Sequence, residues 1–232
     1  MKNLKYPAVA ALTLFLTTGL LAAESDRTKI HENANLVQPL LPGMQAPEFR
    51  VKDVNAKPFQ FDPENMENPV IITFFRGGWC PYCNLHLAEL RKAEQTLKEM
   101  GFDIWFISID KPETLYSSLE DPEIAYTLYS DSGLEATRAF GLAFRVDDET
   151  VERYLGYDID LENASGETHH VLPAPSTFLI GSDGIIRFQY TNPDYKVRLH
   201  PEVLLAAAEA YSNDVDARLE REFKRYLESL EQ

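Results

Sequence analysis

The strongest constraint on the fold is an apolar segment that leads directly into a cysteine pair. Residues 70–75 (VIITFF) are β-branched and aromatic, which is typical of a buried strand. Residues 80–100 then place leucines among charged side chains at helical spacing, and the pattern ends at Gly101, a common residue after a helix. Cys80 and Cys83 therefore lie where a buried strand turns into a helix, which predicts an α/β domain.

Other segments with regular periodicity complete the expected order of elements. They are a hairpin over 49–61, a second buried strand over 102–109, helices over 112–119 and 134–140, and a hairpin over 177–188 with Gly-Ser-Asp-Gly at its turn. Strands alternating with helices, followed by a hairpin, predict a central mixed β-sheet flanked by helices.

The first residues have the pattern of a signal peptide spanning 1–23. Lys2 and Lys5 precede an uncharged apolar run over 8–21, which is shorter than the roughly 20 residues that cross a bilayer. We therefore expect export to the periplasm or another extracytoplasmic compartment, without stable membrane insertion. Because Leu20 and Leu21 are not the small residues that cleavage prefers, an uncleaved anchor remains the alternative.

The rest of the chain is expected to form one domain with two additions. The segments are a polar N-terminal arm over 24–45, a domain over 46–232, a polar insertion over 147–170 and a C-terminal helix over 201–230. The insertion is either a lid over the cysteine pair or a surface loop. Apolar residues of the C-terminal helix, among them Leu204, Phe223 and Leu227, are expected to cover the core, and an interface between two copies of the chain is the alternative.

The charge balance limits the partners of the chain. Its 232 residues carry a formal net charge of −15, which repels nucleic acid and anionic membranes. The chain contains only two cysteines, so a scaffold of several disulfides is excluded.

The spacing of the cysteines favours redox chemistry. A cysteine at a helix N-terminus faces free backbone N–H groups and the positive end of the helix dipole, which stabilise a thiolate. Pro81 suits the first helical turn, and the i, i+3 spacing brings both sulfurs to one face. We expect Cys80 to be the nucleophile, exposed at the turn, and Cys83 to resolve it one turn inward, without an external cofactor. A structural disulfide or half of a zinc site are the alternatives, disfavoured by the short loop and by the lack of further cysteines.

A family resemblance supports this interpretation. Residues 75–83 (FRGGWCPYC), with Trp79 and Tyr82 inside the motif, resemble the active-site segment of peroxiredoxin-like proteins in the AhpC/TSA redoxin family of the thioredoxin superfamily. Residues 46–49, 130–131, 139–141, 173–180 and 194–198 resemble later segments of the same family, so the likeness covers about residues 43–205. The resemblance implies a thioredoxin-like fold.

Two departures from the family bear on the activity. Gly77 stands where typical peroxiredoxins carry a threonine, and Pro175 stands where they carry an arginine. Pro175 instead resembles the cis-proline of thioredoxins, which packs beside the cysteine pair. We therefore expect thiol–disulfide exchange with protein or small-molecule thiols. The alternative is a thiol peroxidase that reduces hydroperoxides through a Cys80 sulfenic acid resolved by Cys83, with a thiol electron donor. A Cu(I)-binding protein that uses His169 and His170 is a third interpretation.

Three polar residues are candidates for supporting roles. Arg76 lies four residues before Cys80 and either lowers its pKa or is a surface cation. His86 shares the helical face of Cys83 and either shuttles protons or faces solvent. Arg198 either approaches the site from the end of the chain or pairs with an acidic residue at the surface.

Overall fold

The structure is a computed structural model that describes residues 26–115, 126–212 and 215–230. The expected signal peptide, the start of the arm and the end of the helix expected over 112–119 lie outside the described residues. Within the described ranges, no helix combines enough length with enough apolar character to cross a bilayer.

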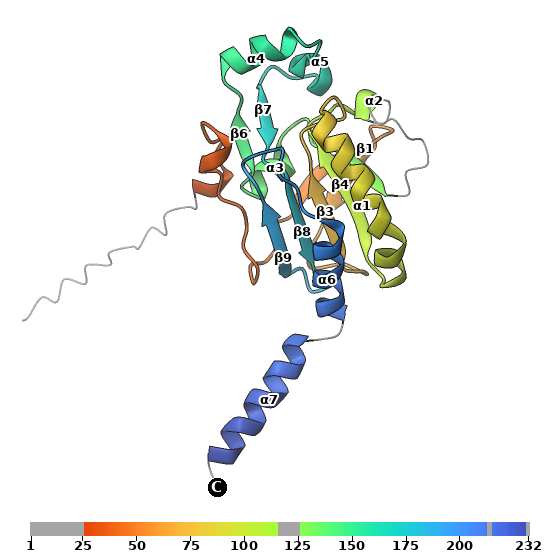
Figure 1. Ribbon diagram of the computed structural model, residues 1–232, viewed down its shortest axis with the longest axis vertical. Helices are drawn as coiled ribbons and strands as arrows, with labels where there is room; N and C mark the ends of the chain where they lie inside the picture. The colour runs from red at the N-terminus through yellow and green to blue at the C-terminus, as the bar shows by residue number, and fades with distance from the viewer. Residues whose placement is uncertain (1–25, 116–125, 213–214, 231–232) are drawn as a thin grey trace, which may run out of the picture.

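A mixed sheet of seven strands organises the domain (Figure 1). In spatial order the strands are β2 (Pro58–Phe61), β1 (Phe49–Asp53), β5 (Thr127–Ser130), β4 (Asp103–Ser108), β3 (Val70–Phe74), β8 (Ser176–Ile180) and β9 (Ile186–Thr191). β3 pairs in parallel with β4, and β4 with β5, whereas the other neighbours are antiparallel. A separate two-stranded sheet contains β6 (Ala143–Arg145) and β7 (Val171–Pro173).

Helices cover both faces of the large sheet. The helices of the described residues are α1 (Pro81–Glu99), α2 (Pro112–Leu115), α3 (Glu135–Ala139), α4 (Asp148–Leu155), α5 (Leu161–Ser165), α6 (Pro201–Ser212) and α7 (Val215–Leu230). Short 3-10 turns, Asp26–Thr28 and Ala34–Leu36, precede β1. α1 and α6 pack side by side on one face, and α3 packs against β1 on the other. The N-terminal end of α1 points toward the end of the domain that carries α4 and α5 (Figure 1).

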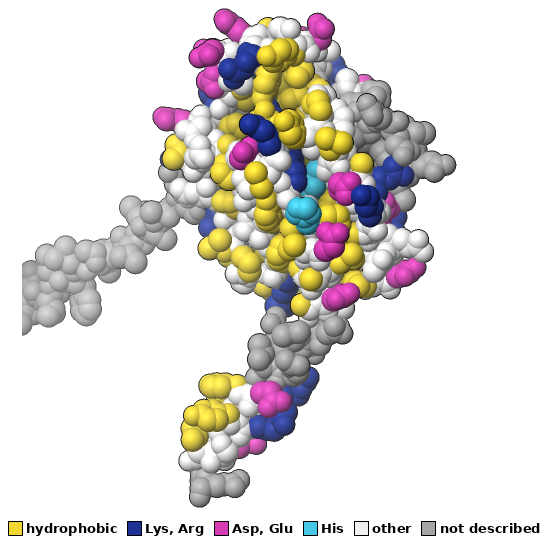
Figure 2. All heavy atoms as spheres, viewed as in Figure 1, with side chains coloured by type: hydrophobic (Ala, Val, Ile, Leu, Met, Phe, Trp, Pro, Cys, Tyr) yellow, Lys and Arg dark blue, Asp and Glu magenta, His cyan; other side chains and the backbone are white. Residues whose placement is uncertain are grey.

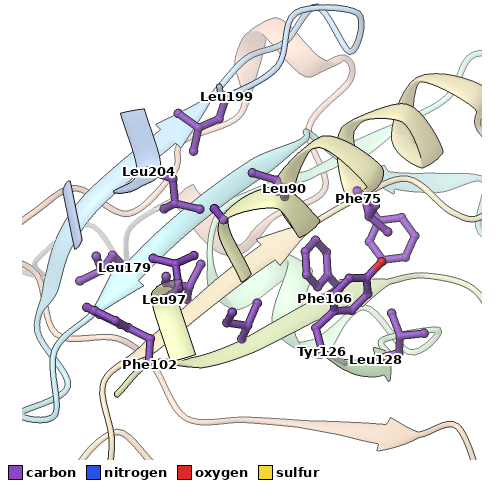
Figure 3. Packing of buried hydrophobic residues seen from close by; sticks show 14 of the residues in the cluster. Phe75, Leu90, Leu97, Phe102, Phe106, Tyr126, Leu128, Leu179, Leu199 and Leu204 are labelled. Carbon is purple, nitrogen blue, oxygen red and sulfur yellow. The ribbon is translucent and has the colours of Figure 1, made fainter. Parts of the chain in front are cut away.

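Successive side chains of β3 point to opposite faces of the sheet, so the strand contributes to two hydrophobic cores. Ile71 belongs to the core between the sheet and helices α1 and α6, and Ile72 belongs to the core on the opposite face. Figure 3 shows Leu90, Leu97 and Leu204 from the two helices converging on the first of these cores. Burial of each such side chain contributes about 2 kcal/mol. The rigid end of β3 is therefore a firm base for the residues that follow it.

The sequence predicted most of this domain correctly. The hairpin of β1 and β2, the buried strands β3 and β4, the helix α1 and the hairpin of β8 and β9 are all confirmed, and so is the central mixed sheet flanked by helices. Residues 147–170, expected to be a polar insertion, contain the helices α4 and α5.

The C-terminal expectation is wrong in two respects. The stretch over 201–230 forms two helices, α6 and α7, instead of one. Leu204 on α6 is buried as expected, but Phe223 and Leu227 on α7 are exposed. Figure 2 shows apolar side chains on one side of α7 and charged side chains on the other, and Figure 1 shows α7 extending away from the sheet. The amphipathic pattern correctly predicted a helix, but this helix, α7, does not cover the core of the domain.

Candidate active site

Both cysteines lie at the start of α1 as the sequence predicts. Cys80 is the N-cap residue, with φ −95° and ψ 111°, and Pro81 follows in the first turn, where its missing N–H costs nothing. The Cys83 N–H donates to the Cys80 carbonyl over 2.9 Å, which closes the first turn. Both residues are free thiols. The expectation that Cys80 is exposed is wrong, because only 2% of its surface is accessible.

The electrostatics of the pair make Cys80 the more acidic of the two thiols. A hydrogen bond from the Cys83 thiol has the largest effect on Cys80, and together with the Arg76 cation it outweighs burial and lowers the pKa of Cys80 to about 6. Cys83 is fully buried, and this burial, with the hydrogen bond to Cys80, raises the pKa of Cys83 well above its usual value. Near neutral pH the pair therefore holds one thiolate, on Cys80, and one protonated thiol, on Cys83.

Arg76 is the cation beside Cys80. It is 4% exposed, and its Nη1 lies 3.7 Å from Cys80 Sγ while its Nη2 donates to the Tyr154 hydroxyl. The guanidinium also lies 4.1 Å from the centre of the Tyr195 ring and 5.1 Å from that of Trp79. Burial lowers the pKa of Arg76, but the effects of Cys80 and Tyr154 outweigh it and raise the pKa. Arg76 is thus a buried partner of the thiolate and not a surface cation.

Arg198 has a matching position beside the second sulfur. Its Nη2 lies 3.4 Å from Cys83 Sγ, and its Nε donates to the Tyr195 carbonyl over 2.6 Å. Of the two alternatives stated for Arg198, the structure shows the approach to the cysteine pair.

Gly77 departs from the family pattern for a steric reason. Its φ is +153°, in the region that favours glycine. A Cβ at this position would lie 2.7 Å from Asp110 Oδ1 and closer still to the Trp79 indole. The space that a threonine side chain would need is therefore filled by Trp79 and Asp110.

Asp110 is a buried carboxyl group that the sequence analysis did not identify. Its Oδ2 accepts a 2.8 Å hydrogen bond from the Gly78 N–H, while its Oδ1 has no hydrogen-bond partner in the described residues. Burial, with a smaller contribution from nearby Cys83 and against the effect of the bond from Gly78, raises the pKa of Asp110 to about 7. The position of Asp110 shortly after the second buried strand could have identified it. Because β3 and β4 are parallel, the residues that follow them, Asp110 and the segment before Cys80, lie at the same end of the sheet.

His86 is buried and does not face solvent. Its Nε2 lies 3.1 Å from the Leu199 carbonyl oxygen, which requires Nε2 to be the donor and leaves Nδ1 as an unpaired acceptor. Burial, followed by the nearby Arg198 cation, lowers the pKa of His86 to about 4. His86 is therefore neutral across the physiological range.

The remaining predicted residues have clear positions. Tyr82 is 43% exposed and packs edge-on against Tyr195. Pro175 lies between β7 and β8, but no peptide bond in the described ranges is cis, so the expected cis bond is wrong. The Ala174 N–H donates to the Leu142 carbonyl, which continues the pairing of β6 with β7 up to the residue before Pro175.

Two further aromatic residues of the site were missed. Tyr154 comes from α4 of the insertion, and Tyr195 comes from the segment after β9. The resemblance of residues 194–198 to a family segment drew attention to Arg198 but not to the tyrosine. For Tyr154 the sequence offered only the alternative that the insertion over 147–170 covers the cysteine pair, and it did not single out the tyrosine.

The histidines proposed for copper lie in other hydrogen-bond networks. His169 uses both ring nitrogens, at Ser132 and Val171, and His170 pairs with Glu162. Among the described residues, no group of three or more histidine, cysteine, aspartate or glutamate side chains is placed to hold a metal ion. The geometry therefore gives the copper interpretation no support.

A buried dithiol with one ionised sulfur, at the start of a helix over a mixed sheet, defines a thiol-redox protein of the thioredoxin-like fold. The family model of the AhpC/TSA family matches residues 42–189. The chain belongs to the AhpC/TSA family, which places it among the thiol-dependent oxidoreductases.

Its relatives carry peroxiredoxin names. The chain is 28% identical over 174 residues to Peroxiredoxin Bcp of Escherichia coli, covering 73% of this chain and 96% of the relative. It is 23% identical over 150 residues to the chloroplastic Peroxiredoxin Q of Arabidopsis thaliana, covering 65% of this chain and 59% of that protein. Peroxiredoxin 5 from Alvinella pompejana has a similar fold, with a TM-score of 0.56 at 23% identity, covering 74% of this chain and 99% of the other.

Proposed function

We propose that this protein is a thiol peroxidase that reduces hydroperoxides at Cys80 and resolves the product with Cys83. The observation that carries the proposal is the asymmetry of the pair, since Cys80 has a pKa of about 6 and lies beside Arg76 while Cys83 keeps its proton. A thiolate is the form that attacks a peroxide oxygen. The peroxiredoxin names of the relatives support the same substrate class.

The proposed reaction has two chemical steps before reduction. The Cys80 thiolate attacks the terminal peroxide oxygen, the S–O bond forms, the O–O bond breaks, and the leaving alkoxide or hydroxide takes a proton. The sulfur loses two electrons and becomes a sulfenic acid. Cys83 then attacks this sulfur, and the disulfide forms as water leaves. An external dithiol returns both cysteines to thiols by disulfide exchange.

Thiol–disulfide exchange as the main activity is the second candidate. Two observations favour it: position 77 has no room for a side chain, and position 175 is a proline, so neither supplies the peroxide contacts of the family pattern. The exchange chemistry is also the reductive half of the peroxidase cycle. The two proposals therefore differ in which oxidant reacts fastest with the reduced protein.

Stopped-flow oxidation of the reduced protein separates the two candidates. For a peroxidase we expect hydrogen peroxide to oxidise Cys80 several decades faster than it oxidises free cysteine. Cys83→Ser should keep that first rate, because the serine hydroxyl can still donate to Cys80, but stop at the sulfenic acid, which a dimedone adduct detects by mass. Cys80→Ser is the matched control and should lose the reaction. A wild-type rate equal to that of free cysteine, with fast reaction toward a disulfide substrate, would establish the exchange enzyme instead.

We also propose that the protein acts outside the cytoplasm. The basic start and the apolar run over 8–21 support this proposal. N-terminal sequencing of the protein from a periplasmic fraction tests it, with a mature chain that begins near residue 24 as the expected result. An intact N-terminus in the cytoplasmic fraction would contradict it.

A further inference from the structure

The proposed reaction needs a hydrogen-bond donor beside the leaving oxygen. As the O–O bond breaks, negative charge grows on the oxygen that departs from Cys80, and fixed donors aimed at that charge lower the barrier. Positions 77 and 175 supply no side-chain donor. Arg76 offers charged donors beside Cys80, and a hydroxyl from another segment would add a neutral donor to them.

Tyr154 brings a hydroxyl to this place from the insertion. Asp147 caps α4 by accepting the Thr150 N–H over 2.8 Å, and the helix ends at Leu155, so Tyr154 lies in its last turn. The Tyr154 ring lies 5.9 Å from the Trp79 ring and packs with the apolar cluster that contains Ile109 and Val171. These contacts hold the ring against the active-site loop.

The hydrogen bonds around Tyr154 leave its proton available. The Tyr154 oxygen accepts from Arg76 Nη2, and no described residue is recorded as the acceptor for its own O–H. The same guanidinium places Nη1 3.7 Å from Cys80 Sγ. One rigid planar group thus links the nucleophilic sulfur to the hydroxyl. Tyr195 does not compete for this role, because it meets Arg76 through the face of its ring.

We propose that Tyr154 is a catalytic residue that donates a hydrogen bond to the leaving oxygen of the hydroperoxide. This inference rests on the proposed peroxidase function. In the reaction the thiolate forms the S–O bond, the O–O bond breaks, and the electron pair of that bond stays on the leaving oxygen. The Tyr154 O–H and Arg76 stabilise this oxygen until it is protonated to an alcohol or water. The insertion therefore completes the active site.

The test is Tyr154→Phe, which removes the hydroxyl and keeps the ring. Tyr157→Phe is the matched control, because Tyr157 lies in the same insertion and is 69% exposed. Three reagents are compared: hydrogen peroxide, whose leaving group is strongly basic, peracetic acid, whose leaving group is a stable carboxylate, and iodoacetamide, which has no leaving oxygen. We expect Tyr154→Phe to lower the rate with hydrogen peroxide about 100-fold. The rates with peracetic acid and iodoacetamide should change less than about threefold, since their leaving groups need little stabilisation.

Each other outcome overturns the inference. An equal loss with all three reagents would mean that Tyr154 only supports the Cys80 thiolate, and an unchanged rate with hydrogen peroxide would mean that the hydroxyl takes no part. Failure of the proposed function is a separate result, because wild-type protein would then react with hydrogen peroxide no faster than free cysteine does. The Cys80 pKa of the variant, measured by thiolate absorbance, and its melting temperature provide the check against a folding defect.

Discussion

The two cysteine sulfurs of the site have similar neighbours, but their pKa values are shifted in opposite directions. Each has an arginine close by, Arg76 at 3.7 Å from Cys80 and Arg198 at 3.4 Å from Cys83. The pKa of Cys80 is nevertheless lowered to about 6, whereas that of Cys83 is raised. The difference comes from burial and from the direction of the thiol hydrogen bond, which Cys83 donates and Cys80 accepts. A nearby cation alone does not make a cysteine reactive in this site.

The largest expected effect concerns the carboxyl group on the Cys83 side. The pKa of Asp110 is raised from 3.8 to about 7 in the folded protein, so its contribution favours folding at low pH and is lost as pH rises from about 4 to 7. Asp110→Asn does not titrate. The variant should therefore gain about 4 kcal/mol of unfolding free energy relative to wild type between pH 4 and pH 8. Denaturant unfolding of the reduced proteins at both pH values measures this difference.

Asp131 provides the internal control for that measurement. It is also buried, with a pKa raised to about 6 by burial, but it accepts the Ala136 and Thr137 N–H groups of α3, far along the chain from the cysteines, and is unchanged in both proteins. If the unfolding free energies of Asp110→Asn and wild type change with pH in parallel, the Asp110 carboxyl has an ordinary pKa. A buried carboxyl group of raised pKa would then not distinguish the surroundings of Cys83 from those of Cys80.

An intermediate effect is expected from exchanging each arginine for a neutral residue. Arg76→Gln should raise the pKa of Cys80 by about one unit, because the cation nearest the thiolate is lost. Arg198→Gln should raise it less, since Arg198 has the smaller effect on Cys80. Thiolate ultraviolet absorbance, followed against pH, measures both values. Equal shifts in the two variants would break the assignment of one arginine to each sulfur.

The smallest effect is expected at His86. Its pKa is lowered to about 4, so it carries no exchangeable charge between pH 5 and pH 8. His86→Gln keeps a donor for the Leu199 carbonyl and should leave the pH dependence of Cys80 oxidation unchanged within about twofold. A lost inflection in the rate profile of the variant would show instead that His86 moves protons for the pair.

The sequence predicted the strand, the helix and the cysteines of the site better than it predicted the residues that cover them. The junction of residues 70–75 with the helix at Cys80 follows from local composition, so the strand, the helix and the position of both cysteines were predictable. The burial of Cys80 was not, because its cover comes from distant segments. Tyr154 is separated from Arg76 by 78 residues, and periodicity carries no information about such a contact.

The same limit explains the errors at Pro175 and in the C-terminal region. A local likeness to thioredoxins suggested a cis bond before Pro175, but a short segment of similar sequence does not define the peptide isomer, and the bond is trans. The apolar stripe of α7 predicted a buried face, but a stripe does not say which surface covers it. Patterns along the chain define which residues are apolar, and only the fold defines their neighbours.

The aromatic surroundings of Arg76 have a consequence for the driving force of electron transfer. Among the described residues, Arg76 contacts aromatic rings, a tyrosine hydroxyl and the Cys80 sulfur, and it forms no ion pair with a carboxylate. Oxidation of Cys80 removes the one negative charge at this buried cation. Arg76 therefore stabilises the reduced state and raises the reduction potential of the cysteine pair. The disulfide form then accepts electrons readily from a donor thiol.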